Sequence, residues 1–173
     1  MRLTSFTDYT LRVLMYLALN PERIATVAEI ADAYGISRLH LNKVVLALGQ
    51  AGDIETIRGR NGGIRLAKRA DAINLADVVQ RAEPDMELVP CFANARSCLL
   101  GRCCLLQGVL QRANHAFVAE LARHTLADLL GAGGPSAALF ADQQPPERPV
   151  PRRRTRAVAP REPGPAARAA ANP

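Results

Sequence analysis

The sequence predicts a mostly α-helical protein, built as a winged helix-turn-helix with a long C-terminal helix. Thr26-Val27-Ala28-Glu29 is a capping box, which opens a short helix. Tyr34-Gly35-Ile36-Ser37 is a tight turn from which a second helix starts, and two helices joined in this way form a helix-turn-helix. Asn61-Gly62 follows between strand-like runs at 53–57 and 64–67, which is a strong hairpin signal. A helix-turn-helix followed by a hairpin is a winged helix.

The helix that precedes this unit is indicated by its cap and its apolar spacing. Thr4 or Ser5 can cap a helix that runs to about Leu19 and stops at Asn20-Pro21. We expect one apolar face on this helix, formed by Phe6, Leu11, Leu14, Met15 and Ala18.

Two helical segments follow the predicted wing. Asn74 can cap a short helix that Glu83-Pro84 ends. Residues 105 to about 130 repeat apolar side chains at intervals of three and four, which predicts one helix of about 39 Å. A helix this long beside so small a domain most often pairs with its twin in a homodimer. The alternative is that it packs on its own domain.

The net charge of +6 is unevenly distributed. Residues 132–173 hold seven arginines against three acids, a net of +4, which leaves +2 for residues 1–131. The same segment holds nine of the twelve prolines and few large apolar residues, so we expect a disordered tail. Its basic run at 152–156 is either a nonspecific DNA contact or a solvated segment without a role.

The predicted recognition helix and wing carry the candidate DNA-binding residues. A recognition helix contacts base edges through its N-terminal turns, and Arg and Asn are suited to guanine and adenine. The wing is basic and rich in glycine, which suits a phosphate or minor-groove contact, although a solvated basic loop has the same composition. The candidates are Ser37, Arg38, His40, Asn42 and Lys43 on the helix, and Arg58, Arg60, Asn61, Gly62 and Arg65 in the wing, with Lys68 and Arg69 beyond it.

All four cysteines, Cys91, Cys98, Cys103 and Cys104, fall within fourteen residues. Thiolates bind zinc and iron–sulfur clusters, and a reducing compartment disfavours disulfides. Adjacent Cys103 and Cys104 rarely reach one small ion together, so three thiols are the natural count. The wide intervals suit an iron–sulfur cluster, while zinc, reversible thiol oxidation and a purely structural role stay open. A four-iron cluster needs a fourth ligand, for which Asp, Glu, His, water and a thiol are candidates.

Residues 1–131 resemble the winged-helix iron–sulfur transcriptional repressors, and among them the nitric-oxide-sensing type. The resemblance is carried by a series of short motifs in a fixed order. They are Leu3-Thr4-Ser5-Phe6-Thr7-Asp8-Tyr9, Tyr34-Gly35-Ile36-Ser37, Arg58-Gly59-Arg60-Asn61-Gly62-Gly63-Ile64-Arg65-Leu66, Asp77-Val78-Val79 with Glu83-Pro84, the cysteine loop, and Thr125-Leu126-Ala127-Asp128-Leu129.

This resemblance implies a homodimer with one cluster per subunit, of the 4Fe–4S type, held by Cys91, Cys98 and Cys103. It implies Asp8 of the partner subunit as the fourth ligand; without the resemblance, Asp8 is an acid that favours the N-terminal end of a helix dipole. Cys104 is the alternative to Cys103. Related regulators of iron–sulfur biogenesis use a His after the third Cys, where this chain has Leu106 and Gln107.

The expected function is that of a cytoplasmic, nitric-oxide-sensing repressor. The cluster-bound dimer binds double-stranded operator DNA with an inverted repeat, and nitrosylation releases it, which derepresses nitric-oxide detoxification genes. The alternative is a related repressor switched by thiol oxidation, iron or zinc. We expect no enzyme, because no triad, phosphate-binding Gly loop or paired carboxylates are apparent. Neither a signal peptide nor a membrane span is predicted.

These interpretations divide the chain into four parts. They are a winged-helix DNA-binding domain at 1–85, a cluster-binding loop at 86–104, a dimerisation helix at 105–131 and a disordered tail at 132–173.

Overall fold

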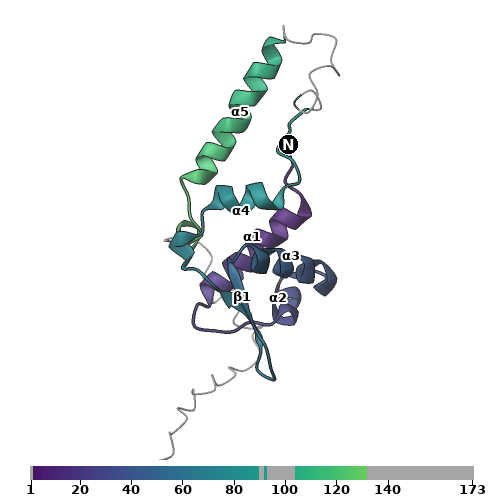
Figure 1. Cartoon of the computed structure of the whole chain (residues 1–173), viewed down its shortest axis with the longest axis vertical. Helices are drawn as coiled ribbons and strands as arrows, with labels where there is room; N and C mark the ends of the chain where they lie inside the picture. The colour runs from purple at the N-terminus through teal and green to yellow at the C-terminus, as the bar shows by residue number, and fades with distance from the viewer. Residues whose placement is uncertain (1, 90–91, 93–103, 132–173) are drawn as a thin grey trace, which may run out of the picture.

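The computed structural model describes residues 2–89, 92 and 104–131. Most of the cysteine loop and the tail at 132–173 lie outside the described residues, so the predictions for them stay untested. The predicted fold class is confirmed: the structure is mostly helical, with one two-stranded sheet (Figure 1). The elements are α1 (Ser5–Leu19), α2 (Val27–Tyr34), α3 (Arg38–Gln50), β1 (Ile54–Ile57), β2 (Gly63–Leu66), η1 (Ala70–Ala72), α4 (Leu75–Ala82), α5 (Leu105–Ala122) and η4 (Ala127–Leu130).

The helix ends of the winged-helix domain follow local sequence signals. Thr4, rather than Ser5, is the N-cap of α1, and its side chain accepts a hydrogen bond from the Thr7 backbone N–H. The capping box at the start of α2 is formed in both directions between Thr26 and Glu29. Gly35 ends α2 with φ of 64°, the left-handed conformation that favours glycine.

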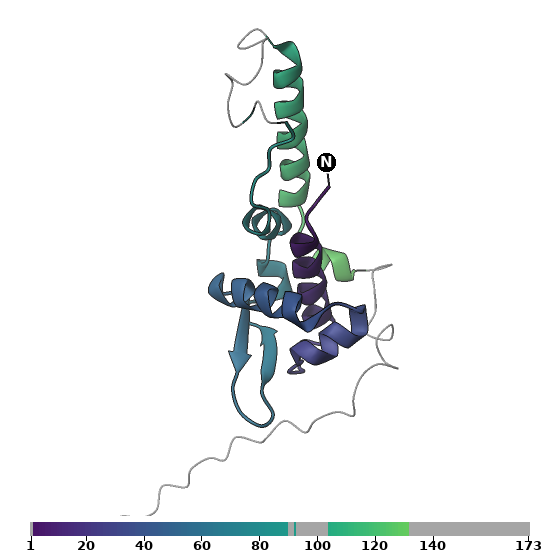
Figure 2. The same cartoon turned by 90° about the vertical axis from the view of Figure 1, so that its right-hand side faces the viewer.

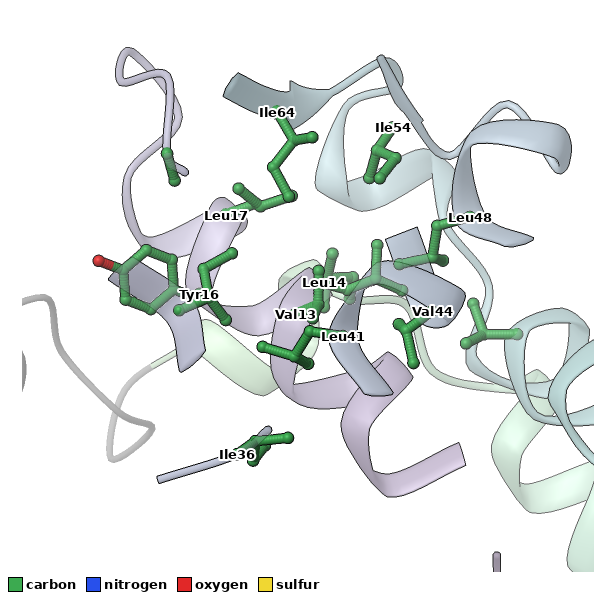
Figure 3. Packing of buried hydrophobic residues seen from close by; sticks show 14 of the residues in the cluster. Val13, Leu14, Tyr16, Leu17, Ile36, Leu41, Val44, Leu48, Ile54 and Ile64 are labelled. Atoms are coloured by element: carbon green, nitrogen blue, oxygen red, sulfur yellow. The ribbon is translucent and has the colours of Figure 1, made fainter. Parts of the chain in front are cut away.

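The core lies where α1, α3 and the hairpin meet (Figure 3). Helix α1 runs through its centre and contacts α3, α4, β2 and η4. The single apolar face predicted for this helix is therefore too narrow. All five predicted residues pack against the core, but only Leu14 is fully buried. The buried residues of α1 are the apolar Val13, Leu14, Tyr16 and Leu17 and the polar Thr7 and Thr10.

The wing is an antiparallel hairpin whose turn requires glycine. Ile54 pairs with Leu66 at one end of the hairpin and Ile57 with Gly63 at the other. A Cβ atom at Gly62 would lie 2.2 Å from the Ile57 carbonyl oxygen, and one at Gly63 would lie 2.4 Å from the Ala25 carbonyl oxygen. Both distances are far below contact distance, so a larger residue at Gly62 would displace the end of β1, and one at Gly63 would push β2 away from the segment at Ala25.

Helix α5 is shorter than the single helix predicted from Leu105 to about Leu130. It ends at Ala122, and the chain then turns back to the winged-helix domain. The Leu126 backbone N–H donates to the Ile73 carbonyl oxygen at 2.8 Å, and the Leu126 side chain is fully buried in the core. A continuous helix would carry Leu126 away from this position, so burial of one leucine and pairing with the start of α4 outweigh helix continuation.

Helix α5 extends away from the winged-helix domain in both views (Figures 1 and 2). It touches α4, and the Asn114 side-chain amide donates to the Met86 carbonyl oxygen at 3.0 Å. No residue of α5 is fully buried. Among the described residues, no helix is long and apolar enough to cross a membrane.

Candidate functional site

Helix α3 buries one face in the core and exposes the other. Leu41, Val44 and Leu48 form its buried face. Ser37 occupies the N-cap position, but its side chain makes no capping hydrogen bond, so its hydroxyl is available to another partner. The five residues predicted on this helix are all exposed: Ser37, Arg38, His40, Asn42 and Lys43.

The first turn of α3 also contacts its neighbours. The His40 ring stacks on the Tyr9 ring of α1, with 6.2 Å between centroids and 25° between planes. Arg38 lies 3.5 Å from the Asp32 carboxylate of α2, and both side chains are exposed. A pair this exposed is worth little free energy, so Arg38 can leave it for a phosphate or a base.

The basic residues in and beyond the wing are not equally available. Arg65 is paired with Glu55 across the hairpin, and Arg69 with Asp71. Lys68 lies 2.7 Å from the Asp53 carboxylate. Within the described part of the chain, no ion pair is formed by Arg58 or Arg60, which flank the tip of the hairpin. The structure therefore leaves the tip as the more cationic end of the predicted surface.

Two further predicted wing residues lie at the same tip. Asn61 is exposed, as are Arg58 and Arg60. Gly62 is partly buried and has a structural role, because its backbone N–H donates to the Gly59 carbonyl oxygen at 2.9 Å and no Cβ fits there. Gly62 thus shapes the turn that presents the arginines.

A buried carboxylate connects the wing to α4. Asp53 is 1% exposed and lies immediately before β1. One carboxylate oxygen accepts a hydrogen bond from Lys68, which follows β2, and the other accepts one from Arg81 on α4. The side chains of Lys68 and Arg81 are both partly exposed. A buried charge is stable only when it is paired, so this triad fixes the base of the wing against α4. We did not predict it, since the partners are far apart in the sequence.

The predicted metal ligands are only partly described. Cys91, Cys98 and Cys103 lie outside the described residues. Cys104 is the partly exposed N-cap residue of α5, and its side chain makes no capping hydrogen bond. Among the described residues, no group of three or more His, Cys, Asp or Glu side chains could hold a metal ion.

Asp8, the predicted fourth ligand, is paired within its own chain. It lies in the first turn of α1, and the Arg12 Nε is 3.0 Å from each carboxylate oxygen. Both side chains are nearly half-exposed, so the pair is weak enough to open. The Arg12 guanidinium also lies 5.6 Å from the Tyr34 ring centroid, and burial raises the pKa of Tyr34.

Glu83 ties the start of α1 to the end of α4. Its carboxylate accepts hydrogen bonds from the Thr4 backbone N–H at 2.8 Å and from the hydroxyls of Thr4 and Thr7. The N-terminal turn of α1, which carries Asp8, is thereby fixed to the segment that leads towards the first cysteine. A separation of 79 residues between Thr4 and Glu83 leaves no local signal for this contact.

Comparison with known proteins identifies the family. The model of the Rrf2 family, described as an iron-dependent transcriptional regulator, matches residues 3–132. The chain belongs to the Rrf2 family. It is therefore a DNA-binding transcriptional repressor.

Curated Rrf2 relatives are similar over the same region. An HTH-type transcriptional regulator NsrR of Halalkalibacterium halodurans is 50% identical over 132 residues, which are 75% of this chain and 90% of the relative. The NsrR regulators of Shouchella clausii and Bacillus subtilis are 49% and 46% identical over the same share of this chain, covering 89% and 90% of their own lengths. These matches support the resemblance to NsrR-type regulators.

Solved Rrf2-like structures share the fold. An IscR from T. potens has a TM-score of 0.61 at 21% identity and covers 75% of this chain and 86% of its own. CymR of B. subtilis, described as the global cysteine regulator, has a TM-score of 0.59 at 25% identity and covers 75% of this chain and 95% of its own.

Proposed function

We propose that this Rrf2 repressor is a cytoplasmic nitric-oxide sensor that works as a homodimer on an inverted-repeat operator. The observation that carries the proposal is the position of Asp8. It is adjacent to Tyr9, whose ring stacks on His40 of the recognition helix. A ligand that engages Asp8 therefore acts one residue from a direct contact with the DNA-reading helix. The 46–50% identity to NsrR regulators supports the same function.

The donor set fits an iron–sulfur cluster. Three thiols within thirteen residues, Cys91, Cys98 and Cys103, provide thiolates, and Cys104 is the alternative third thiol. The Asp8 carboxylate is nearly half-exposed and can be reached by a second subunit. Such a 4Fe–4S cluster would supply iron that reacts with nitric oxide.

Contacts within the chain can couple a bond at Asp8 to the affinity for operator DNA. When Asp8 binds outside its own chain, it releases Arg12, while Glu83 keeps the first turn of α1 fixed to the segment before the cysteines. When that bond is lost, Asp8 returns to Arg12 and the first turn of α1 no longer holds the partner subunit. While the bond to Asp8 is intact, the cluster and DNA would favour the same dimer geometry, which is the condition for coupling between two sites.

The exposed apolar residues of α5 support a dimer. Leu105, Leu106 and Val109 are 88%, 62% and 50% exposed, and they adjoin Cys104. Apolar side chains clustered at one end of a helix favour burial against a second copy. A two-fold dimer would place its recognition helices about 34 Å apart, one turn of DNA, which requires an inverted repeat.

The decisive experiment is a nitric oxide titration of anaerobically purified protein. We expect a visible iron–sulfur absorption spectrum, iron and sulfide in cluster stoichiometry, and loss of operator binding as nitric oxide is added. A colourless zinc protein whose DNA binding is insensitive to nitric oxide would overturn the proposal.

Variants separate the ligand assignments. Cys91→Ala and Cys98→Ala should abolish cluster retention, and Cys104→Ala should not. If Cys104→Ala loses the cluster and Cys103→Ala retains it, Cys104 rather than Cys103 is the third ligand. Asp8→Asn should retain the fold but lose the response to nitric oxide. Asp77→Asn is the control, because Asp77 is likewise the acid in the first turn of a helix.

The wing assignment is tested with a matched pair of arginines. Arg60→Ala should weaken DNA binding and reduce its salt dependence by about one phosphate contact. Arg69→Ala is the control, because Arg69 lies beyond β2, away from the wing tip. Equal effects of the two substitutions would remove the wing tip from the interface.

A second candidate function is supported by the description of the family as iron-dependent. In that case iron availability, rather than nitric oxide, sets cluster occupancy and operator binding. Chelation of iron would then release DNA, and nitric oxide added to the loaded protein would not.

A further inference from the structure

The outermost line of side chains on α3 is largely apolar. Leu39, Lys43 and Leu46 follow one another at intervals of four and three, so they share one face of the helix. This face lies opposite Leu41 and Val44, which point into the core. Leu39 is 67% exposed and Leu46 is 63% exposed.

These two leucines are unusual in their setting. Among the described residues, the other large exposed apolar side chains, Leu105, Leu106 and Val109, are all on α5. Leu39 instead lies between the cations Arg38 and Lys43, on the helix of a DNA-binding repressor. The surrounding positive charge suits a polyanion, and it disfavours an ordinary apolar protein partner.

We propose that Leu39 contacts the C5-methyl group of a thymine in the major groove and so determines base preference at that position. The thymine methyl is the apolar feature that the major groove offers to a protein, and an aliphatic side chain is its natural partner. The proposal rests on the DNA-binding part of the proposed function. It adds one apolar residue to the polar DNA-binding candidates on α3. Leu39 lies on the face opposite the core, whereas the His40 ring stacks on Tyr9 of α1.

Leu39 is favoured over Leu46 by its position along the helix. Base edges are contacted by the N-terminal turns of a recognition helix, and Leu39 is the second residue of α3. Leu46 lies two turns later, beside a groove formed with Val45 and Ile54 where α3 meets β1. Leu46→Ala is therefore a matched control, with similar exposure on the same face.

The test removes the methyl group from the DNA. Duplexes are first selected from a random pool with the full-length, anaerobically purified protein. Each thymine in the selected site is then replaced by deoxyuridine, and the dissociation constant is measured at one salt concentration for the wild type, Leu39→Ala and Leu46→Ala. Thermal unfolding of the three proteins verifies that they are equally folded.

We expect one symmetry-related pair of thymines at which the wild type loses about 4-fold in affinity per half-site, the contribution of one buried methyl group. Leu39→Ala should lose none of its affinity on the same replacement, whereas Leu46→Ala should behave as the wild type does. Leu39→Asn should shift the selected base towards adenine, since Asn pairs with adenine in the major groove.

Two results would overturn the inference alone: wild-type binding that does not depend on any thymine methyl, or equal methyl dependence in the wild type and Leu39→Ala. Failure of the wild type to select any duplex would overturn the proposed function as well.

Discussion

The winged-helix domain and α5 differ in how completely each buries its own apolar side chains. Helix α1 alone buries four such residues, Val13, Leu14, Tyr16 and Leu17, whereas α5 buries none. Helix α1 is also the shorter of the two, with 15 residues against 18. The described structure thus combines a domain that completes its own core with a helix that does not.

We infer from this contrast that α5, rather than the winged-helix domain, needs a second molecule to bury its apolar side chains. In the winged-helix domain, the buried carboxylate Asp53 is neutralised by two cations of the same chain. On α5, Leu105 and Leu106 face solvent beside the cysteine segment. We therefore expect variants of the domain to alter its folding, and variants of α5 to alter assembly.

The largest effect is expected from a cavity in the core. Leu14→Ala removes a fully buried side chain from the central helix and should lower the free energy of unfolding by about 2–5 kcal/mol. Urea unfolding followed by circular dichroism measures it. A change smaller than that caused by Leu105→Ala, at the most exposed leucine of α5, would contradict the comparison.

The next effect concerns the charge at the base of the wing. Asp53→Asn should lower the free energy of unfolding by about 1.5–3 kcal/mol, the range for hydrogen bonds to charged groups. The cost stays below that of a fully buried ion pair because Lys68 and Arg81 can be solvated. DNA binding should weaken as well, since the wing loses its attachment to α4. Asp71→Asn, in an exposed pair, is the control, and an equal loss there would argue against the triad.

A smaller effect is expected from a substitution on α5, and it concerns the free energy of self-association rather than that of unfolding. Leu106→Asp places a charge among the exposed apolar residues and should weaken self-association at least about tenfold, or ~1.4 kcal/mol. Sedimentation at several concentrations measures it, with Gln111→Asp as a control at an exposed polar position of the same helix. An unchanged dimer would show that these leucines do not form the interface.

The smallest effect is expected at the turn after α5. Hydrogen bonds donated by the Thr125 backbone N–H and hydroxyl hold the pKa of Asp128 below its usual value. A depressed pKa stabilises the fold above the unfolded-state pKa, about 3.9 for Asp, and this contribution is lost as the pH falls through the folded-state value. Asp128→Asn should therefore lower the melting temperature slightly near neutral pH. The difference should vanish on acidification; one that grows instead would contradict the assignment.

Local signals made most of the winged-helix domain predictable. The capping box of Thr26 and Glu29, the glycine turn at Gly35 and the Asn61-Gly62 hairpin each specify structure over a few residues, and all formed as expected. The polar residues predicted on α3 are exposed, whereas the exposure of the apolar Leu39 among them was not predicted.

Contacts between distant residues were not predictable in the same way. The hydrogen bonds of Glu83 with Thr4 and Thr7, and the pairing of Asp53 with Arg81, depend on how helices pack. The end of α5 was not predicted for the same reason, because no local signal near Ala122 indicates that Leu126 is buried in the core. The single apolar face predicted for α1 is incomplete, because a central helix is covered on more than one side.

The burial of Leu126 has a consequence for synthesis of the protein. Among the residues that the structure describes, Leu126 is the last fully buried side chain of the core, and it is made 51 residues after α4 begins at Leu75. At roughly 5–20 residues per second, a growing chain spends roughly 3–10 s with this core open. During that interval the nascent winged helix exposes apolar surface that a chaperone can bind, and a chain that stops short of Leu126 would keep it exposed.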